Sequence, residues 1–438
     1  MMKTAILLYH FFKSLIEIHL SARLPYGLQR KLCERRLIRS IRHAYDHVPF
    51  YRQKYDAAGV DITSIRSADD IKRLPFVTKE EIRQNFPDGI VARGVNREAC
   101  RYSATTGSTG RSLPFIFTQA TYAFYVALGV RMYTMIGYRP WHKMAYIKYT
   151  DLNYTRLGPF FRAVHIKSTI PVEEQIAQLR KAGADLIIGY ASLVYEIARN
   201  ATPDDLKDIR PKFIGINSEL STEAQRTFIS ETFGCPVYDE YSTEETWMIA
   251  SQCRCNNYHI FTDNVWVEFI DAKGQEVAPG DMGEIVLTTT RSPAMPFIRY
   301  RIGDMGRFSN AECPCGMGFP LLQSFEGRAD DCFILPSGKF VSSLKLLNTF
   351  TMYIKKYLHL LEEFKVTQVH SDLIVIKIVK GNQYDSAHLE ELLADLRRLL
   401  DDSVSIKTEF VDVIEKTDGI KRKAIESLVS QKQTGSPS

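Results

Sequence analysis

Residues 102–114 read Tyr-Ser-Ala-Thr-Thr-Gly-Ser-Thr-Gly-Arg-Ser-Leu-Pro, and they are the most informative stretch of the chain. Between Ser103 and Gly110 this stretch holds two glycines and five Ser or Thr residues. Gly107 and Gly110 let backbone N–H groups approach phosphate oxygens, and the hydroxyl groups add further donors. The stretch lacks the Gly-Lys-Ser/Thr ending of a P-loop NTPase. It therefore predicts either a phosphate-binding loop of another kind or a solvated hairpin turn.

The segments around this loop predict an α/β fold. Helical patterning dominates the chain before it, from residue 28 to about residue 96. After it, short apolar runs at 144–149, 185–190, 212–217 and 234–241 alternate with amphipathic segments at 172–182 and 222–233. Such alternation is typical of a sheet with a large parallel portion. Residues 264–290 instead show every-second-residue alternation and a Pro-Gly-Asp turn, which predict an antiparallel piece.

The last part of the chain predicts a second, smaller domain. Its pattern is strand (363–370), strand (373–379), helix (385–400) and strand (405–413). Leucines fall on one face of the predicted helix, with Asp385 or Ser386 placed to cap it. We therefore expect a large multi-layer α/β domain at 1–328 and a small α+β domain at 329–438.

Composition narrows the class of protein. The 438 residues are 45% hydrophobic and 24% charged, which are ordinary globular values. The net charge of +5 is mild and no dense basic run is evident, so nucleic acid is not an expected partner. Residues 4–22 are interrupted by His10, Lys13 and Glu17, so they predict an amphipathic helix packed on the protein body. Peripheral membrane contact through residues 4–22 is the alternative.

Further motifs follow the glycine loop in a fixed order. Residues 216–219 read Ile-Asn-Ser-Glu, 239–245 read Asp-Glu-Tyr-Ser-Thr-Glu-Glu, and 295–304 read Met-Pro-Phe-Ile-Arg-Tyr-Arg-Ile-Gly-Asp. Residues 327–331 read Gly-Arg-Ala-Asp-Asp. Together these motifs resemble the adenylate-forming (AMP-binding) enzymes, in the phenylacetate–CoA ligase-like branch that includes the CapK-like capsule-biosynthesis relatives.

The chain departs from the family pattern at three of these positions. Arg111 replaces the usual lysine of the loop and keeps its charge. Ser242 stands where the family has glycine, and Asn217 is atypical. The resemblance covers nearly the whole chain in spite of these departures.

The resemblance implies roles for individual residues. Tyr241 would stack on adenine, Asp304 would accept hydrogen bonds from the ribose hydroxyls, and Arg328 would contact ribose or phosphate. Glu245 would be catalytic by holding Mg2+ beside the triphosphate, and Asp330 would be the hinge of a mobile small domain. The remaining nucleotide-binding residues implied are Thr105, Thr106, Gly107, Ser108, Thr109, Gly110, Arg111, Ser218 and Glu219.

Cysteine spacing predicts a metal site. Eight cysteines are too few for a disulfide scaffold, so the close pairs Cys253/Cys255 and Cys313/Cys315 indicate metal binding in a reducing, cytoplasmic compartment. With His259 they offer a Cys3His set, which is common for structural zinc. The resemblance implies Cys253, His259, Cys313 and Cys315 as ligands and leaves Cys255 as a spare. Free buried thiols are the alternative.

The small domain of the family carries a catalytic lysine directly after a glycine. Here residues 416–423 read Lys-Thr-Asp-Gly-Ile-Lys-Arg-Lys, so Ile420 occupies that position and Lys421 follows it. A shift of one residue in an extended loop turns a side chain to the opposite face. Lys421 is the predicted catalytic residue. The alternatives are that Lys416 or Lys423 has that role, or that adenylation is weak or lost.

The implied function is ATP-dependent, AMP-forming activation of a small carboxylic acid, followed by acyl transfer. CoA is the expected acceptor, which makes the protein an acid–CoA ligase that uses ATP, Mg2+ and a structural Zn2+. An amine or a carrier-protein thiol is an alternative acceptor, and a nucleotide-binding protein with degenerate adenylation activity is a second alternative. A homodimer is one possible assembly.

Overall fold

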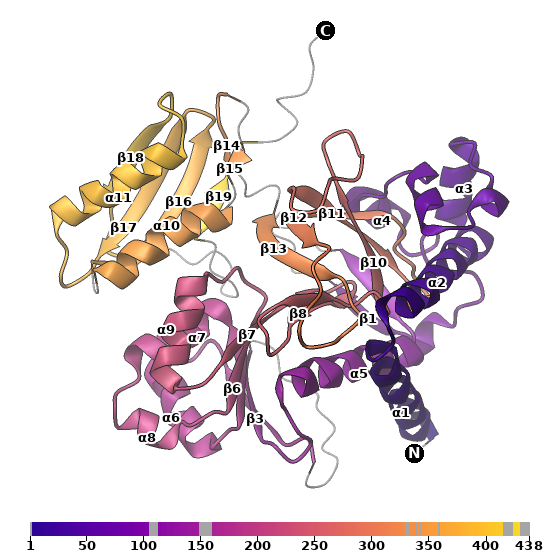
Figure 1. The fold of residues 1–438 in the computed structure, drawn as a ribbon, viewed down its shortest axis with the longest axis horizontal. Coiled ribbons are helices and arrows are strands. Elements are labelled where there is room, and N and C mark those ends of the chain that lie inside the picture. The colour runs from indigo at the N-terminus through magenta and orange to yellow at the C-terminus, as the bar shows by residue number, and fades with distance from the viewer. Residues whose placement is uncertain are drawn as a thin grey trace. The chain divides into compact units, whose positions relative to one another are not determined.

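The computed structural model describes residues 2–104, 113–148, 160–328, 333–337, 340–341, 343–357, 360–414 and 424–429 (Figure 1). The chain divides into two compact units, each built from two separate segments. The first unit is Met1–Tyr138 with Glu240–Phe325, and the second is Arg139–Asp239 with Glu326–Ser438. The predicted division at residues 328/329 stays a prediction.

The first unit begins with helices, as the patterning before the glycine loop predicts. The Thr78 side chain accepts a hydrogen bond from the backbone N–H of Glu81, and the Glu81 carboxylate accepts one from the backbone N–H of Thr78; this capping box starts α4. Helix α1 packs against α5 (Figure 1). The helices of this unit are α1 (Met2–Ala22), α2 (Tyr26–His47), α3 (Pro49–Ala57), η1 (Ile62–Ser64), η2 (Ala68–Arg73), α4 (Lys79–Asn85), η3 (Arg97–Ala99) and α5 (Gln119–Ile136).

The strands of the first unit are largely antiparallel. β10 pairs with β11 in the register Val265↔Thr289, which confirms the antiparallel piece expected at 264–290. β1 pairs with β2, so antiparallel strands flank the glycine loop on both sides. The strands are β1 (Arg101–Ala104), β2 (Pro114–Phe117), β8 (Trp247–Gln252), β9 (Tyr258–Ile260), β10 (Val265–Ile270), β11 (Gly283–Thr289), β12 (Tyr300–Ser309) and β13 (Leu321–Arg328), of which β13 extends past this unit's end at Phe325.

The second unit contains the predicted parallel strands. Their order is β7-β6-β5-β3-β4, and neighbouring strands run parallel. Helices α6, α7 and α9 cover one face of these strands and bury a shared aliphatic core (Figure 1). The elements are β3 (Met144–Lys148), β4 (Ala163–Lys167), α6 (Val172–Ala182), β5 (Leu186–Tyr190), α7 (Ala191–Asn200), α8 (Asp205–Asp208), β6 (Phe213–Asn217), α9 (Glu223–Phe233) and β7 (Val237–Thr243), whose last residues fall in the first unit.

Local sequence explains where helix α6 begins and ends. Glu173 and Glu174 lie in its first turn and Arg180 and Lys181 in its last, and this arrangement complements the helix dipole. Gly183 ends it with a φ of 51°, a left-handed conformation that glycine adopts without a Cβ clash. The bounds agree with the predicted segment 172–182.

The rest of the second unit is the α+β part expected after residue 329. Its four strands have the order β18-β17-β16-β19, and the leucine face of α11 lies in a core with Ile374, Ile376 and Ile378. Asp385 caps α11 by accepting from the backbone N–H of Ala387, as expected. The elements are β14 (Phe333–Ile334), β15 (Phe340–Val341), α10 (Ser343–Lys356), β16 (Leu361–His370), β17 (Leu373–Lys380), α11 (Ser386–Leu399), β18 (Ser405–Phe410) and β19 (Ile425–Ser427).

Candidate functional site

Tyr241 and Asp304, the predicted adenine and ribose ligands, lie in contact in the first unit. The Tyr241 hydroxyl donates a hydrogen bond to Oδ2 of Asp304 over 2.7 Å. The Tyr241 ring also stacks on Phe325, with the ring centres 4.3 Å apart. Both predicted side chains are buried. The structure therefore brings an aromatic ring and a carboxylate together, the two kinds of group that a nucleoside needs for its base and its sugar.

Glu245, the predicted magnesium ligand, is a buried carboxylate between β7 and β8. Its Oε1 accepts a hydrogen bond from the Tyr300 hydroxyl at 3.0 Å and lies 3.8 Å from Nζ of Lys79. Among the described residues, no hydrogen bond or ion pair is made to Oε2. A carboxylate oxygen without such a partner is chemically able to bind a cation.

Ser218 and Glu219 follow β6 in the second unit. Ser218 has a φ of 65°, which is unusual for a residue other than glycine. Glu219 accepts a hydrogen bond from the backbone N–H of Ser192 at the start of α7, over 2.9 Å. A carboxylate at the N-terminus of a helix is favoured by the helix dipole. The Glu219 side chain therefore connects the loops that follow the parallel strands β5 and β6, where open α/β sheets bind ligands.

Several predicted site residues lie outside the described residues. These are Asp330, Lys421 with its alternatives Lys416 and Lys423, and the glycine-loop residues Thr105, Thr106, Gly107, Ser108, Thr109, Gly110 and Arg111. Arg328 is the last residue of β13, but its side chain is not among those described. The roles of all these residues stay predictions.

The four predicted zinc ligands of the first unit lie together. The ligand atoms of Cys253, His259, Cys313 and Cys315 are all within 4.8 Å of one another. The Sγ atoms of Cys253 and Cys313 are 3.6 Å apart, and Sγ of Cys315 lies 3.2 Å from Nε2 of His259. Ligands about 2.3 Å from a tetrahedral zinc ion lie about 3.8 Å from one another, so the observed spacing suits such an ion.

The surroundings of this Cys/His cluster also suit a metal. Burial lowers the pKa of His259 to about 4, so its ring is neutral at neutral pH, the form that binds a metal. The side-chain amide of Asn257 donates to the sulfur of Cys313 over 3.3 Å. Cys255, the predicted spare, is exposed and does not belong to the cluster, although its backbone N–H donates to Cys253.

Sequence reasoning missed three contributors to these sites. Lys79 reaches Glu245 from the start of α4, and no local pattern links two residues so far apart in the chain. Near the Cys/His cluster, Arg131 forms a fully buried bidentate pair with Asp263, at 2.6 and 3.0 Å. Arg131 also lies over the ring of Phe261, 4.2 Å from its centre. An arginine in a helix otherwise rich in apolar residues was the only sequence signal for this pair.

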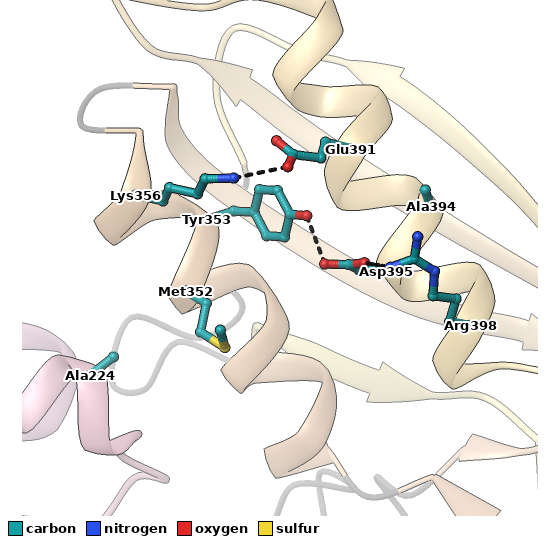
Figure 2. Close-up of a pocket in the computed structure, with 8 residues that line it drawn as sticks. All are labelled: Ala224, Met352, Tyr353, Lys356, Glu391, Ala394, Asp395 and Arg398. Carbon is teal, nitrogen blue, oxygen red and sulfur yellow. Dashed lines mark hydrogen bonds and ion pairs between the residues drawn. The ribbon is translucent and has the colours of Figure 1, made fainter.

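A groove of about 500 Å3 lies in the second unit (Figure 2). It is lined by Ala224, Met352, Tyr353, Lys356, Glu391, Ala394, Asp395 and Arg398. Lys356 pairs with Glu391 at 2.8 Å, and Asp395 accepts from Tyr353 at 2.7 Å (Figure 2). No predicted site residue lines the groove. The charged groups of the groove pair with one another, so the groove is not our candidate for the active site.

Known proteins resemble the chain over most of its length. No model of a protein family matches it. A phenylacetate–coenzyme A ligase of Thermus thermophilus is 28% identical over 328 residues, which cover 71% of this chain and 73% of the relative. The chain is an adenylate-forming enzyme of the phenylacetate–CoA ligase-like branch. CapK of Staphylococcus aureus is 24% identical over 375 residues, and the aligned residues cover 81% of this chain and 79% of CapK.

A solved structure of this superfamily has the same fold. The 2-hydroxyisobutyryl-CoA ligase in complex with 2-HIB-AMP aligns with a TM-score of 0.79 at 21% identity, covering 94% of this chain and 92% of that one. This likeness confirms the expected mixed α/β fold, and the sequence relatives confirm the expected branch of the adenylate-forming enzymes.

Proposed function

We propose that this adenylate-forming enzyme is an ATP-dependent acid–CoA ligase. In the first step a carboxylate oxygen of the acid attacks the α-phosphorus of ATP, and the bond to the leaving pyrophosphate breaks. In the second step the sulfur of CoA attacks the acyl carbon, the bond to AMP breaks, and the thiol proton is released. The products are an acyl-CoA thioester, AMP and pyrophosphate. CoA ligases among the relatives support this choice of acceptor.

The contact between Tyr241 and Asp304 is the observation that carries the proposal. In a nucleoside the base and the ribose hydroxyls adjoin each other, so their ligands must also adjoin, as the 2.7 Å hydrogen bond between these side chains provides. Phe325 covers one face of the Tyr241 ring, so adenine would stack on the other face. When ATP binds, the Asp304 carboxylate would accept hydrogen bonds from the ribose hydroxyls, either in place of the Tyr241 hydroxyl or in addition to it.

The triphosphate would be held by the glycine loop and a magnesium ion. Backbone N–H groups around Gly107 and Gly110 and the charge of Arg111 suit phosphate oxygens. Oε2 of Glu245 would be the protein ligand of Mg2+, which typically takes one or two carboxylates together with phosphate oxygens and water. The Tyr300 hydroxyl and Lys79 would keep the Glu245 carboxylate oriented. Lys421 would neutralise the charge that develops at the α-phosphate.

The Cys/His cluster would hold a structural zinc ion. Three thiolates and one imidazole give a closed tetrahedral set with no open position for substrate. Cys253 and His259 flank the turn between β8 and β9, whereas Cys313 and Cys315 lie between β12 and β13. A zinc ion would therefore cross-link two loops of the first unit and stabilise its fold.

A pyrophosphate-release screen tests the proposal. The purified chain is incubated with ATP, Mg2+ and a panel of aryl and aliphatic acids, and products formed with CoA or with amines are identified by mass spectrometry. Acid-dependent pyrophosphate release with a CoA thioester supports the proposal. An amide product would assign an amine acceptor, and ATP binding without release for any acid would favour degenerate adenylation activity. The homodimer, the membrane contact of residues 4–22 and the cytoplasmic location stay predictions.

A further inference from the structure

The outer face of helix α1 is apolar and uncovered. Phe11 and Ile18, on the face toward the core, are 7% and 0% exposed. On the opposite face, five large apolar side chains are between 47% and 64% exposed: Ile6, Tyr9, Phe12, Ile16 and Leu20. Their spacing of three and four residues places them on one stripe along the helix. We call these five residues the α1 stripe.

The α1 stripe lies in the most basic part of the chain. Residues 1–45 contain nine Lys or Arg residues and two glutamates, a net charge of +7, so the remainder of the chain has a net charge of −2. The mild overall charge therefore conceals a strong local excess. Lys13 lies on the stripe itself, and Arg23 follows α1 directly. The other exposed basic residues are Arg30, Lys31, Arg35, Arg39 and Arg42.

Both glutamates of this segment are already engaged. Glu17 accepts hydrogen bonds from Arg36 and Arg291, each at 2.6 Å, and Glu34 accepts from the backbone N–H of Ala68 at 2.7 Å. None of these seven exposed basic residues forms an ion pair with a carboxylate in the described part of the chain. What α1 and the part of α2 up to residue 45 present outward is therefore mainly apolar and cationic, and Asp46 near the end of α2 is an exposed acidic residue beside it.

We propose that the α1 stripe docks on a membrane surface that carries anionic lipids. A helix with one apolar face and basic residues beside it lies in the plane of the interface, with its apolar side chains among the acyl chains. Tyr9 adds a ring with a polar tip, a type of side chain that favours this boundary. None of the described helices is both long and apolar enough to cross a bilayer, and the proposed contact requires no crossing.

Charge favours a membrane over a second copy of the chain. In a two-fold contact through the same face, each patch meets itself, so Lys13 and its cationic neighbours would face like charges. An anionic bilayer instead attracts each basic residue that lies near its surface. The cations and the apolar side chains would then act together.

Vesicle flotation with the full-length chain tests this docking. The chain is expected to float with phosphatidylcholine–phosphatidylserine vesicles at low salt, with less binding at high salt and to phosphatidylcholine alone. The double substitution Ile16→Glu/Leu20→Glu is expected to reduce the partition coefficient about tenfold or more, because two apolar side chains no longer leave water. Met352→Glu is the matched control, because Met352 is 65% exposed against 64% and 63% for the mutated residues.

Three readouts separate the outcomes. Unchanged thermal unfolding and pyrophosphate release in the double variant show that its fold and active site are intact. The proposal is overturned if the unmodified chain does not bind the anionic vesicles, or if the double variant binds them equally well. A third outcome is that the unmodified chain does not bind vesicles and is a dimer by light scattering, whereas the double variant is a monomer. This outcome would show that the α1 stripe binds a second copy of the chain.

Discussion

The hydroxyl of Tyr241 donates a 2.7 Å hydrogen bond to Oδ2 of Asp304, although 63 residues separate them in the sequence. The bond holds the end of the tyrosine ring beside the carboxylate. A ligand that stacks on the ring would thereby have its polar groups near the acid. Removing the carboxylate charge and removing the hydroxyl should consequently have different effects.

Asp304→Asn is expected to weaken ATP binding about tenfold or more, because a hydrogen bond to a charged group contributes about 1.5–3 kcal/mol. Tyr241→Phe keeps the ring and should change the ATP affinity much less. Isothermal titration of both variants with ATP, at equal protein stability, makes the comparison. Equal affinity of Asp304→Asn and the unmodified chain would show that the carboxylate does not bind the nucleotide.

The Cys/His cluster should contain about one zinc ion per chain. Cys253→Ser and Cys315→Ser are expected to lose the ion and to unfold at a temperature several degrees lower, because binding of a structural metal contributes directly to folding. Cys255→Ser is the control, because this exposed neighbour lies outside the cluster. Elemental analysis and thermal unfolding provide the measurements. A full complement of zinc in Cys253→Ser, or no zinc in chain purified without chelator, contradicts the assignment.

Local chemistry made much of the fold predictable. Helix α9 begins at the capping box of Thr222 and Gln225 and ends at Gly234, which has a φ of 63°. Its ends therefore lie within one residue of the expected segment 222–233. It was less predictable which side chains of a helix would be buried. In α1 both Ile16 and Ile18 are apolar, yet one is 64% exposed and the other fully buried, because the position of α5 decides which face is covered.

The residues of the candidate site also differ in how well the sequence predicts them. Tyr241, Glu245 and the Cys/His ligands stand in short motifs, so the sequence alone can nominate them. Lys79 and Asp263 act only through partners brought near by tertiary folding, and neither stands in a motif. The grouping of residues 139–239 with 326–438 likewise has no local signal.

The buried pair Arg131–Asp263 should be important for stability. Asp263→Asn leaves the buried guanidinium without its counter-charge, and breaking such a pair costs about 3–5 kcal/mol. The matched control is Asp208→Asn, which breaks the exposed pair with Arg180 at 2.7 Å and should shift the unfolding midpoint little. Chemical unfolding followed by circular dichroism compares the two. Equal midpoints for both variants would mean that the buried pair contributes no more than the exposed one.

Lys421→Ala should slow acid-dependent pyrophosphate exchange about 100-fold, the order of effect of one electrostatic group at a developing charge. Lys416→Ala and Lys423→Ala are the parallel variants, because both lysines lie in the same segment. A large loss in one of these variants with none in Lys421→Ala would transfer the role to that lysine. Small effects in all three would indicate that adenylation does not depend on a lysine of this segment.

Glu245→Gln should raise the Mg2+ concentration for half-maximal pyrophosphate release about tenfold, because the neutral amide keeps the shape of the carboxylate and loses its charge. The amide oxygen can still accept from the Tyr300 hydroxyl, so a large loss of stability is not expected. Glu244→Gln is the control, since Glu244 directly precedes Glu245 in the chain but is exposed. An unchanged Mg2+ requirement in Glu245→Gln, with normal ATP affinity, would exclude this carboxylate as a magnesium ligand. If Glu244→Gln raised the Mg2+ requirement equally, the effect would come from the overall negative charge of the turn and not from Glu245 as a ligand.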